Sequence, residues 1–350
     1  MRLPLAFILM TMMIDSMGIG LILPVMPALL REIGDIPLAS AAILGGILTT
    51  VFAAMQFIFG PVIGAISDRY GRRPVLLVAL FIMALDYLVM ALAQVFWLLF
   101  IGRIVGGITA ATQSTASAFV ADISEPHEKA ARFGLIGAAF GVGFVLGPLL
   151  GGALAEYGTR APFFAAAVLT AANTVFGFLV MPETVTDRTR RPLTLARTNP
   201  LGAFLNVGLN PNLRRLLILL CIYHVAFAVY PAIWAFFTEA RFGWSPGMIG
   251  LSLGAFGISM AIVQGGLIRW ILKWLGDRNT VIYGIAFNFF AFLVLAFVTS
   301  GTVALMFIPL TALGAVVMPA VQGMMSRVTT DDSQGELQGV LASVAALATI

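Results

Sequence analysis

Charged residues are scarce in this sequence. Asp, Glu, Lys and Arg make up 10% of its 350 residues, whereas a typical soluble domain carries roughly 25%. A soluble fold of this length would need far more polar surface. The apolar residues, 60% of the chain, come in blocks of about 20, which is the length of helix that crosses a hydrocarbon core of ~30 Å. We therefore expect an all-α membrane protein.

Cysteine and histidine are nearly absent as well. The single cysteine, Cys221, lies inside an apolar run, so a disulfide framework is excluded. The sequence contains only two histidines, His127 and His224, and it has no nucleotide-binding loop and no group of residues that could act as an activated nucleophile. Few residues are therefore available for catalysis. We expect no enzymatic activity, no metal site and no cofactor.

The apolar blocks predict a series of membrane-spanning helices. Backbone groups in hydrocarbon must be satisfied internally, so helices are the only sensible interpretation of such blocks. An eleventh span begins near Gln334, after ten expected spans at 4–30, 42–63, 73–95, 97–120, 130–155, 161–181, 213–238, 247–273, 279–299 and 301–326.

Basic residues predict the orientation of these spans. Nearly all of the 20 Lys and Arg residues fall on the side that carries the N-terminus, and the opposite side holds only Arg31, Arg160 and Arg241. Cytoplasmic loops carry an excess of Lys and Arg. We therefore expect the N-terminus in the cytoplasm.

One long polar segment divides the chain. Residues 183–212 are rich in Arg, Thr, Pro and Asn and cannot span a membrane. They are expected to form a central cytoplasmic loop between an N-terminal six-helix half at 1–182 and a C-terminal half at 213–350.

A weak internal repeat supports the division into halves. Asp277-Arg278 resembles Asp68-Arg69 at an offset of 209 (277 − 68), and the segment ending at Gly339 resembles the one ending at Gly134 at an offset of 205 (339 − 134). Two six-helix halves related as parallel repeats describe the major facilitator fold. By the same offset the second half should end near residue ~388, so we expect it to be truncated in helix eleven.

Three charged side chains, namely Asp15, Asp86 and Arg103, lie well inside expected spans, and the ionisable His224 lies near the middle of the seventh. Placing a charged side chain at the bilayer centre costs at least ~2.5–3.5 kcal/mol of insertion free energy, so a charge at such a position indicates a functional role. Since desolvation favours the neutral form of a carboxyl group, a buried carboxylate can take up and release a proton. We expect Asp15 and Asp86 to couple transport to protons and Arg103, which keeps its charge, to be a buried charge partner. The plainer alternative is that these groups only pair with one another.

The segment between the second and third spans is a candidate gating loop. A basic anchor would need only the arginines, but this segment also places a carboxylate, two glycines and a proline at fixed positions. Asp68 could form inter-helix pairs in one conformation only and so act as a latch. The candidate residues are Gly64, Asp68, Arg69, Gly71, Arg72 and Arg73, followed by Pro74.

The fifth span is rich in glycine. Spacings of four place glycines on shared faces, where backbones can approach closely, and a proline loosens the helix. This pattern favours either tight packing or a pliable surface between the halves. The residues are Gly143, Gly147, Pro148, Gly151 and Gly152.

These motifs resemble those of the tetracycline/proton antiporters and related drug exporters of the major facilitator superfamily. The resemblance covers essentially the whole chain, including Asp15-x-x-Gly18-x-Gly20, Gly64 to Pro74, Asp86-Tyr87, Gly102-Arg103 and Gly143-x-x-x-Gly147-Pro148-x-x-Gly151-Gly152. It implies exchange of a cytoplasmic drug, in these pumps a cationic metal–tetracycline chelate, for an incoming proton.

The resemblance also bears on single residues. Asp15, Asp68 and Asp86 match positions that matter for transport, and Gln264 matches a substrate-contacting glutamine. Where the pumps carry a histidine four residues before that glutamine, this chain has Met260. Where they carry an aspartate in helix nine, it has Phe287, followed by Asn288.

We therefore expect a proton-coupled exporter of a small amphiphilic drug-like compound, which could be of the tetracycline type. It would work by alternating access and confer antibiotic resistance. Its energy source is the proton gradient, and its partners are the substrate, protons and the lipid bilayer, without nucleic acid. We expect a monomer in the bacterial inner membrane. The alternatives are an importer or facilitator of another metabolite, and a transport-dead membrane sensor or binding protein. The expected substrate cavity is lined by Asp15, Asp86, Gln264, Asn288, Trp234 and Phe237.

Overall fold

The computed structural model describes residues 3–110, 112–125, 129–186, 199, 211–328 and 334–350. Within these ranges every regular element is a helix, and eight helical segments are long and apolar enough to cross a membrane. The expectation of an all-α protein with helices that can span a membrane is confirmed. Most of the expected central loop at 183–212 lies outside the described residues.

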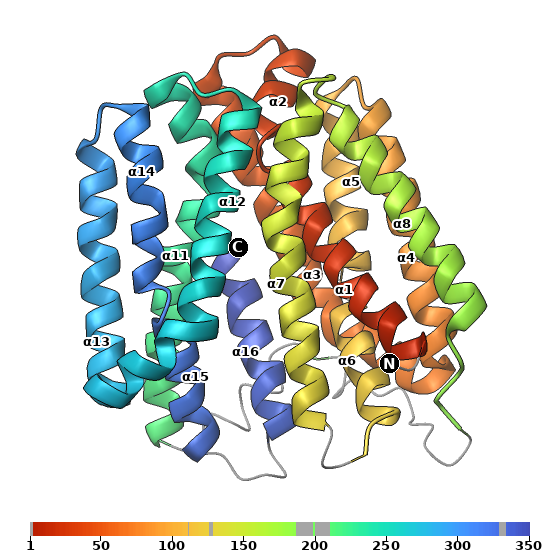
Figure 1. The fold of residues 1–350 in the computed structure, drawn as a ribbon. Helices are drawn as coiled ribbons and strands as arrows, with labels where there is room; N and C mark the ends of the chain where they lie inside the picture. The colour runs from red at the N-terminus through yellow and green to blue at the C-terminus, as the bar shows by residue number, and fades with distance from the viewer. Residues whose placement is uncertain (1–2, 111, 126–128, 187–198, 200–210, 329–333) are drawn as a thin grey trace.

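The first half of the chain forms one group of helices, drawn from red to yellow-green in Figure 1. Its main core contains the fully buried side chains of Phe7, Phe119 and Phe163. The helices are α1 (Leu3–Ile22), α2 (Met26–Gly34), α3 (Leu38–Tyr70), α4 (Arg72–Leu92), α5 (Phe96–Thr109), α6 (Thr112–Asp122), α7 (Lys129–Ala155) and α8 (Ala161–Val180).

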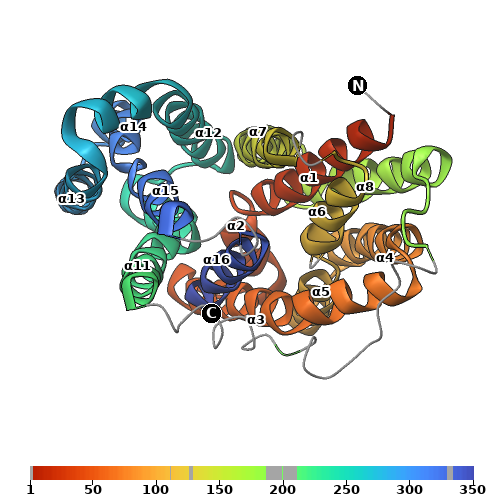
Figure 2. The same ribbon diagram turned by 90° about the horizontal axis from the view of Figure 1, so that it is seen from below.

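The second half forms another group, with cores of its own around Trp234 and Val317. Its helices are α11 (Pro211–Phe242), α12 (Pro246–Ile262), a π-helical segment (Val263–Leu267), α13 (Ile268–Phe297), α14 (Gly301–Thr311), a 3₁₀ turn (Ala312–Gly314), α15 (Val317–Val328) and α16 (Gln334–Thr349). Helices α7 and α12 lie side by side between the groups, as Figure 2 shows from below.

Several predicted spans differ from the helices that form. The span predicted at 4–30 is two helices, α1 and α2, with Pro24 in the turn between them, where its missing N–H breaks no helical bond. The span predicted at 247–273 contains the π-helical segment, and α13 joins it to the span predicted at 279–299 through a sharp turn at Gly276 (φ 71°, ψ 168°). The span predicted at 301–326 is interrupted between α14 and α15.

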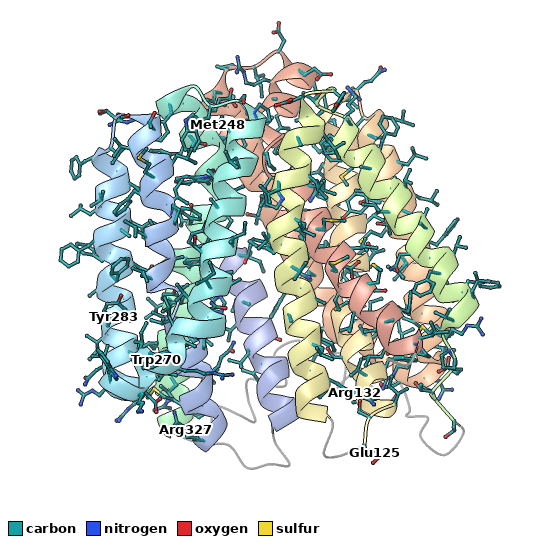
Figure 3. The ribbon with its side chains drawn as sticks, viewed as in Figure 1. Glu125, Arg132, Met248, Trp270, Tyr283 and Arg327 are labelled. Carbon is teal, nitrogen blue, oxygen red and sulfur yellow. The ribbon has the colours of Figure 1, made fainter. Side chains whose placement is uncertain are left out.

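The outer surface is apolar, as lipid requires. Large side chains such as Phe81, Trp97, Trp270 and Phe297 are exposed, and Figure 3 shows many side chains projecting outward from the helices in this view, with Trp270 labelled. Polar residues gather at the ends: Arg132 and Arg327 lie at the lower end in Figure 3, opposite Met248.

Candidate functional site

A cavity inside the first half brings together the three charged residues that the sequence places well inside spans, Asp15, Asp86 and Arg103. It is enclosed by α1, α3, α4, α5 and α7, so both aspartates and the arginine come from different helices. The lining residues are Met12, Asp15, Ile19, Ile22, Phe52, Gln56, Met83, Asp86, Tyr87, Met90, Arg103, Gly106, Ala110 and Phe140.

Close packing of α1 against its neighbours presents Asp15 to this cavity. The Ser16 hydroxyl donates to the backbone carbonyl of Phe140 on α7 at 2.7 Å. One turn after Asp15, Gly18 lies against the Tyr87 hydroxyl of α4, where a Cβ atom would collide with it. Glycine is therefore needed at position 18 to keep Tyr87 beside Asp15.

Asp86 reaches the cavity from α4 and is only 5% exposed. Its carboxylate lies against two glycines of α5, since a Cβ atom added at Gly102 or Gly106 would come within 3.0 Å of one of its oxygens. Residues four apart share one face of a helix. The pair of glycines thus forms a notch in α5 that receives this carboxylate.

Arg103 lines the same cavity from α5. Its guanidinium lies over the ring of Phe52, 5.5 Å from the centroid, and its Nη2 is 3.2 Å from the Met90 sulfur. Among the residues that the structure describes, no carboxylate forms an ion pair with it. A direct ion pair of Arg103 with Asp15 or Asp86, as considered from the sequence, is therefore not formed, although Asp86 attracts the guanidinium electrostatically from a longer distance.

The candidate gating loop is shorter than predicted. α3 continues to Tyr70 and α4 starts at Arg72, so Gly71 alone (φ 114°) breaks the helix, with its N–H bonded to the Ser67 carbonyl at 3.1 Å. A φ in this range favours glycine. Asp68 and Arg69 lie in the last turn of α3. Charged residues can continue a helix beyond the end of its apolar span, so the change in polarity did not mark the end of this helix.

Arg72 connects this turn to α6. It forms ion pairs with Asp68 and, at 3.3 Å, with Asp122, and it donates to the Ser67 hydroxyl at 2.7 Å. Arg73 points to α8, where it donates to the Phe178 carbonyl at 2.8 Å. These contacts link helices within the first half.

Glu183, which the sequence analysis missed, holds the same turn. Its carboxylate accepts hydrogen bonds from the backbone N–H groups of Arg72 (3.0 Å) and Arg73 (3.2 Å), at the start of α4. It lies where a Cβ atom of residue 71 would be. A carboxylate is favourable at a helix N-terminus, and an acid directly after the sixth span was the signal that could have identified it.

The glycines of α7 divide between two neighbours. Gly143, Gly147 and Gly151 lie against the backbone of α1, whereas Gly152 lies against Gly247 and Gly250 of α12. In return, Gly250 lies against the Pro148 carbonyl. The predicted motif therefore packs mostly within the first half, and one edge of it forms the contact between halves.

The residues predicted to line the cavity from the second half lie elsewhere. Trp234 is 3% exposed and donates from its indole N–H to Ser252 at 2.9 Å, with Phe237 next to it in an aromatic cluster. Gln264 donates to the Ala315 carbonyl at 3.1 Å, and Asn288 to the Gly314 carbonyl at 3.2 Å. None of the four lines the cavity that contains Asp15 and Asp86. Trp234 and Phe237 pack in the core of the second half, and Gln264 and Asn288 bind backbone carbonyls between α14 and α15.

Comparison with known proteins places this geometry in context. The sequence matches the Major Facilitator Superfamily over residues 8–350. It is 43% identical to the class C tetracycline resistance protein of Escherichia coli, over 99% of this chain and 87% of that protein. It is 39% identical to the class G tetracycline resistance protein of Vibrio anguillarum, over 96% of this chain and 85% of that protein.

A solved structure has the same fold. The crystal structure of the human organic anion transporter MFSD10 superimposes with a TM-score of 0.74 at 28% sequence identity, over 99% of this chain and 91% of that one.

Proposed function

We propose, on the premise that this chain belongs to the Major Facilitator Superfamily and to the tetracycline resistance proteins within it, that it exports a small amphiphilic drug of the tetracycline type in exchange for protons. A membrane transporter of this superfamily is not an enzyme, so the chemistry to explain is binding and release. The proton gradient would supply the energy, without a cofactor, to a monomer.

The observation that carries the proposal is the enclosed cavity with two carboxylates among apolar and aromatic side chains. Asp15 and Asp86 come from different helices of a bundle whose outer surface is apolar. Ionised carboxylates are costly in such surroundings unless they bind a cation or a proton. A cavity that accepts either the drug or protons on these groups, but not both at once, exchanges one for the other.

Movement between the halves would expose the cavity to each side in turn. At the end where α2 lies (top in Figure 1), Arg31 of α2 pairs with Glu239 of α11 at 2.7 Å, and the Phe236 ring packs on Gly45 of α3. Such contacts have to break when the halves rock. The glycine contact of α7 with α12 supports a pivot, since small residues allow helices to slide against one another.

We propose that the N-terminus lies in the cytoplasm and that the protein resides in the bacterial inner membrane. Arg132 and Arg327 lie at one end of the bundle (Figure 3). Arg72, in the first turn of α4, belongs to the same end, because it pairs with Asp122 and Arg132 donates to the carbonyl of the next residue, Ile123. The positive-inside rule assigns such an end to the cytoplasm. Export from the cytoplasm would then start from the end where these arginines lie.

The test uses a drug-sensitive bacterial host that carries the gene encoding this chain. The host should tolerate more tetracycline and accumulate less of it, and an uncoupler should restore accumulation. Asp15→Asn should abolish this effect while the protein still inserts in the membrane. The matched control is Asp35→Asn, the same substitution at an exposed turn residue with φ 45°. Unchanged efflux in Asp15→Asn would remove the role proposed for this residue.

The alternatives predict other results. An importer or facilitator would raise drug accumulation or leave it sensitive only to the concentration gradient. A membrane sensor or binding protein would bind a ligand without moving it. Efflux that stops with the uncoupler is expected of neither.

A further inference from the structure

Arg103 is a permanent cation inside the cavity, and its surroundings do not neutralise it by direct contact. A guanidinium group stays protonated under all ordinary conditions, and charges within a membrane are nearly always paired. Yet no carboxylate of the described residues forms an ion pair with Arg103, even though Asp15 and Asp86 line the same cavity.

The groups that do contact the guanidinium are weak partners. The face of the Phe52 ring covers one side of it, and a thioether sulfur, that of Met90, is the acceptor of its Nη2. A thioether is a weak hydrogen-bond acceptor. The strongest hydrogen bonds that this fork of N–H donors can make are therefore still available to a ligand in the cavity.

The cavity also fixes the position of the group. Gln56 lies one turn after Phe52 on the same face of α3 and lines the cavity beside it. Its side-chain amide reaches toward the Ala110 carbonyl at 3.5 Å. Phe52 attracts the guanidinium to the face of its ring, and the Met90 sulfur contacts its Nη2, so both side chains hold Arg103 at the cavity wall.

We propose that Arg103 binds an anionic oxygen group of the transported compound, a carboxylate or an enolate, through its N–H groups. The inference rests on the proposed function, since it assigns a substrate class to the same cavity. The ligand is a conjugated or aromatic organic acid, because Phe52, Tyr87 and Phe140 supply flat apolar walls. A planar pair of oxygens matches the guanidinium fork in a way that a single oxygen does not.

A consequence is that the cavity recognises two charges of opposite sign in one compound. Asp15 and Asp86 offer sites for a cationic group or for protons, and Arg103 offers a site for the anionic group. Amphoteric compounds, which carry both kinds of group, fit this arrangement better than purely cationic drugs.

The test is ligand binding to the purified chain in nanodiscs, without transport. The probes are dansylglycine and its methyl ester, which differ only in the anionic carboxylate, and empty nanodiscs correct for partition into lipid. We expect the wild-type protein to bind dansylglycine about ten-fold more tightly than the ester, the scale of a charge-assisted bidentate contact. Equal affinities, or no binding of either probe, would overturn the proposal.

Variants locate the effect. Arg103→Gln should weaken dansylglycine binding about ten-fold and change ester binding less than two-fold, whereas Arg269→Gln, an exposed arginine on α13, should change neither. Arg103→Lys, which keeps the charge, should lie between, because an ammonium lacks the planar fork. Equal losses for both probes in Arg103→Gln or in Arg103→Lys would contradict anion recognition.

If Arg103→Gln does not fold, the proposal can still be tested by comparing the affinities of the wild-type protein and of Arg103→Lys for dansylglycine and its methyl ester. The outcome is also separable from the proposed function. A wild-type protein that shows the carboxylate preference but no uncoupler-sensitive efflux would support the binding site and remove the export function. Efflux without the preference would do the reverse.

Discussion

Arg327 of α15 forms an ion pair with Asp277 of α13, directly after the positive-φ Gly276. In the first half, Asp122 pairs with Arg72, directly after the positive-φ Gly71. One offset of 205 residues relates both partners (277 − 72 and 327 − 122), and the acid and the base have changed places.

The two helix turns are thus built alike with opposite polarity. The structure equates Asp277 with Arg72, whereas the sequence comparison matched it to Asp68 by its local Gly/Ser-Asp-Arg pattern. The glycine that turns the backbone, and not the aspartate, is the feature that the halves share at this point.

Exchange of the second pair tests this relationship. Asp277→Arg and Arg327→Asp each leave like charges in contact and should lower the apparent melting temperature, and the double variant should recover it. The pair is partly exposed, with 64% and 32% of its side chains accessible, so the coupling should be small, about 0.2–1 kcal/mol. High salt should reduce it. A double variant that shows the sum of both losses would contradict the pairing.

Glu183 should stabilise the start of α4. Glu183→Ala removes the acceptor of two backbone N–H groups and should cost about 0.5–2 kcal/mol, as the loss of a helix cap does. Glu183→Gln keeps an acceptor oxygen and should retain part of the stability. Hydrogen exchange at Arg72 and Arg73 measures the local effect. Unchanged exchange at these two amides in Glu183→Ala would show that the carboxylate does not hold them.

The glycine contacts of α7 should be specific to position. Gly151→Ala places a methyl group against the Leu21 backbone, and Gly250→Ala places one against the Pro148 carbonyl. Each should destabilise the protein by about 1–3 kcal/mol, since backbone atoms cannot give way easily. Gly137→Ala and Gly141→Ala on the same helix meet no atom within 4 Å.

These two control variants should be neutral or stabilising by up to ~1 kcal/mol, because alanine is the better helix former. The measurement is the apparent melting temperature of each of the four variants, purified in detergent and compared with the wild-type protein. Similar losses at all four positions would mean that helix propensity, and not the close contact, determines the effect.

Asn288 should stabilise the interruption between α14 and α15. Its amide donates to the freed Gly314 carbonyl and to the Tyr223 hydroxyl oxygen at 3.1 Å. Asn288→Leu leaves the carbonyl unsatisfied in an apolar setting and should cost about 1–3 kcal/mol. Asn279→Leu, at an exposed position of the same helix, is the control. Equal melting temperatures for the two variants would exclude this role.

The sequence was sufficient for the fold and for the ionisable members of the cavity. Apolar blocks identify spans because lipid permits few other structures, and charges inside spans stand out for the same reason. Asp15, Asp86 and Arg103 could therefore be selected before any geometry was known, and the cavity brings them together.

The arrangement within the site depended on contacts that no local pattern encodes. Whether Asp86 meets Arg103 is decided by the absence of Cβ atoms at Gly102 and Gly106 and by the position of the Phe52 ring. Trp234 is of the residue type that often lines a binding cavity, yet here it is buried in the core, where its indole N–H donates to Ser252 on another helix. Such long-range packing is where tertiary structure overrides sequence pattern.

The most direct test of the central claim is proton movement caused by the drug. In everted membrane vesicles whose interior has been acidified by respiration, addition of tetracycline should release protons through the wild-type protein, which a pH-sensitive dye records as recovery of fluorescence. Asp15→Asn and Asp86→Asn should abolish the recovery, and Asp35→Asn should keep it. Drug-dependent proton release that persists undiminished in both Asp15→Asn and Asp86→Asn would contradict coupling through this cavity.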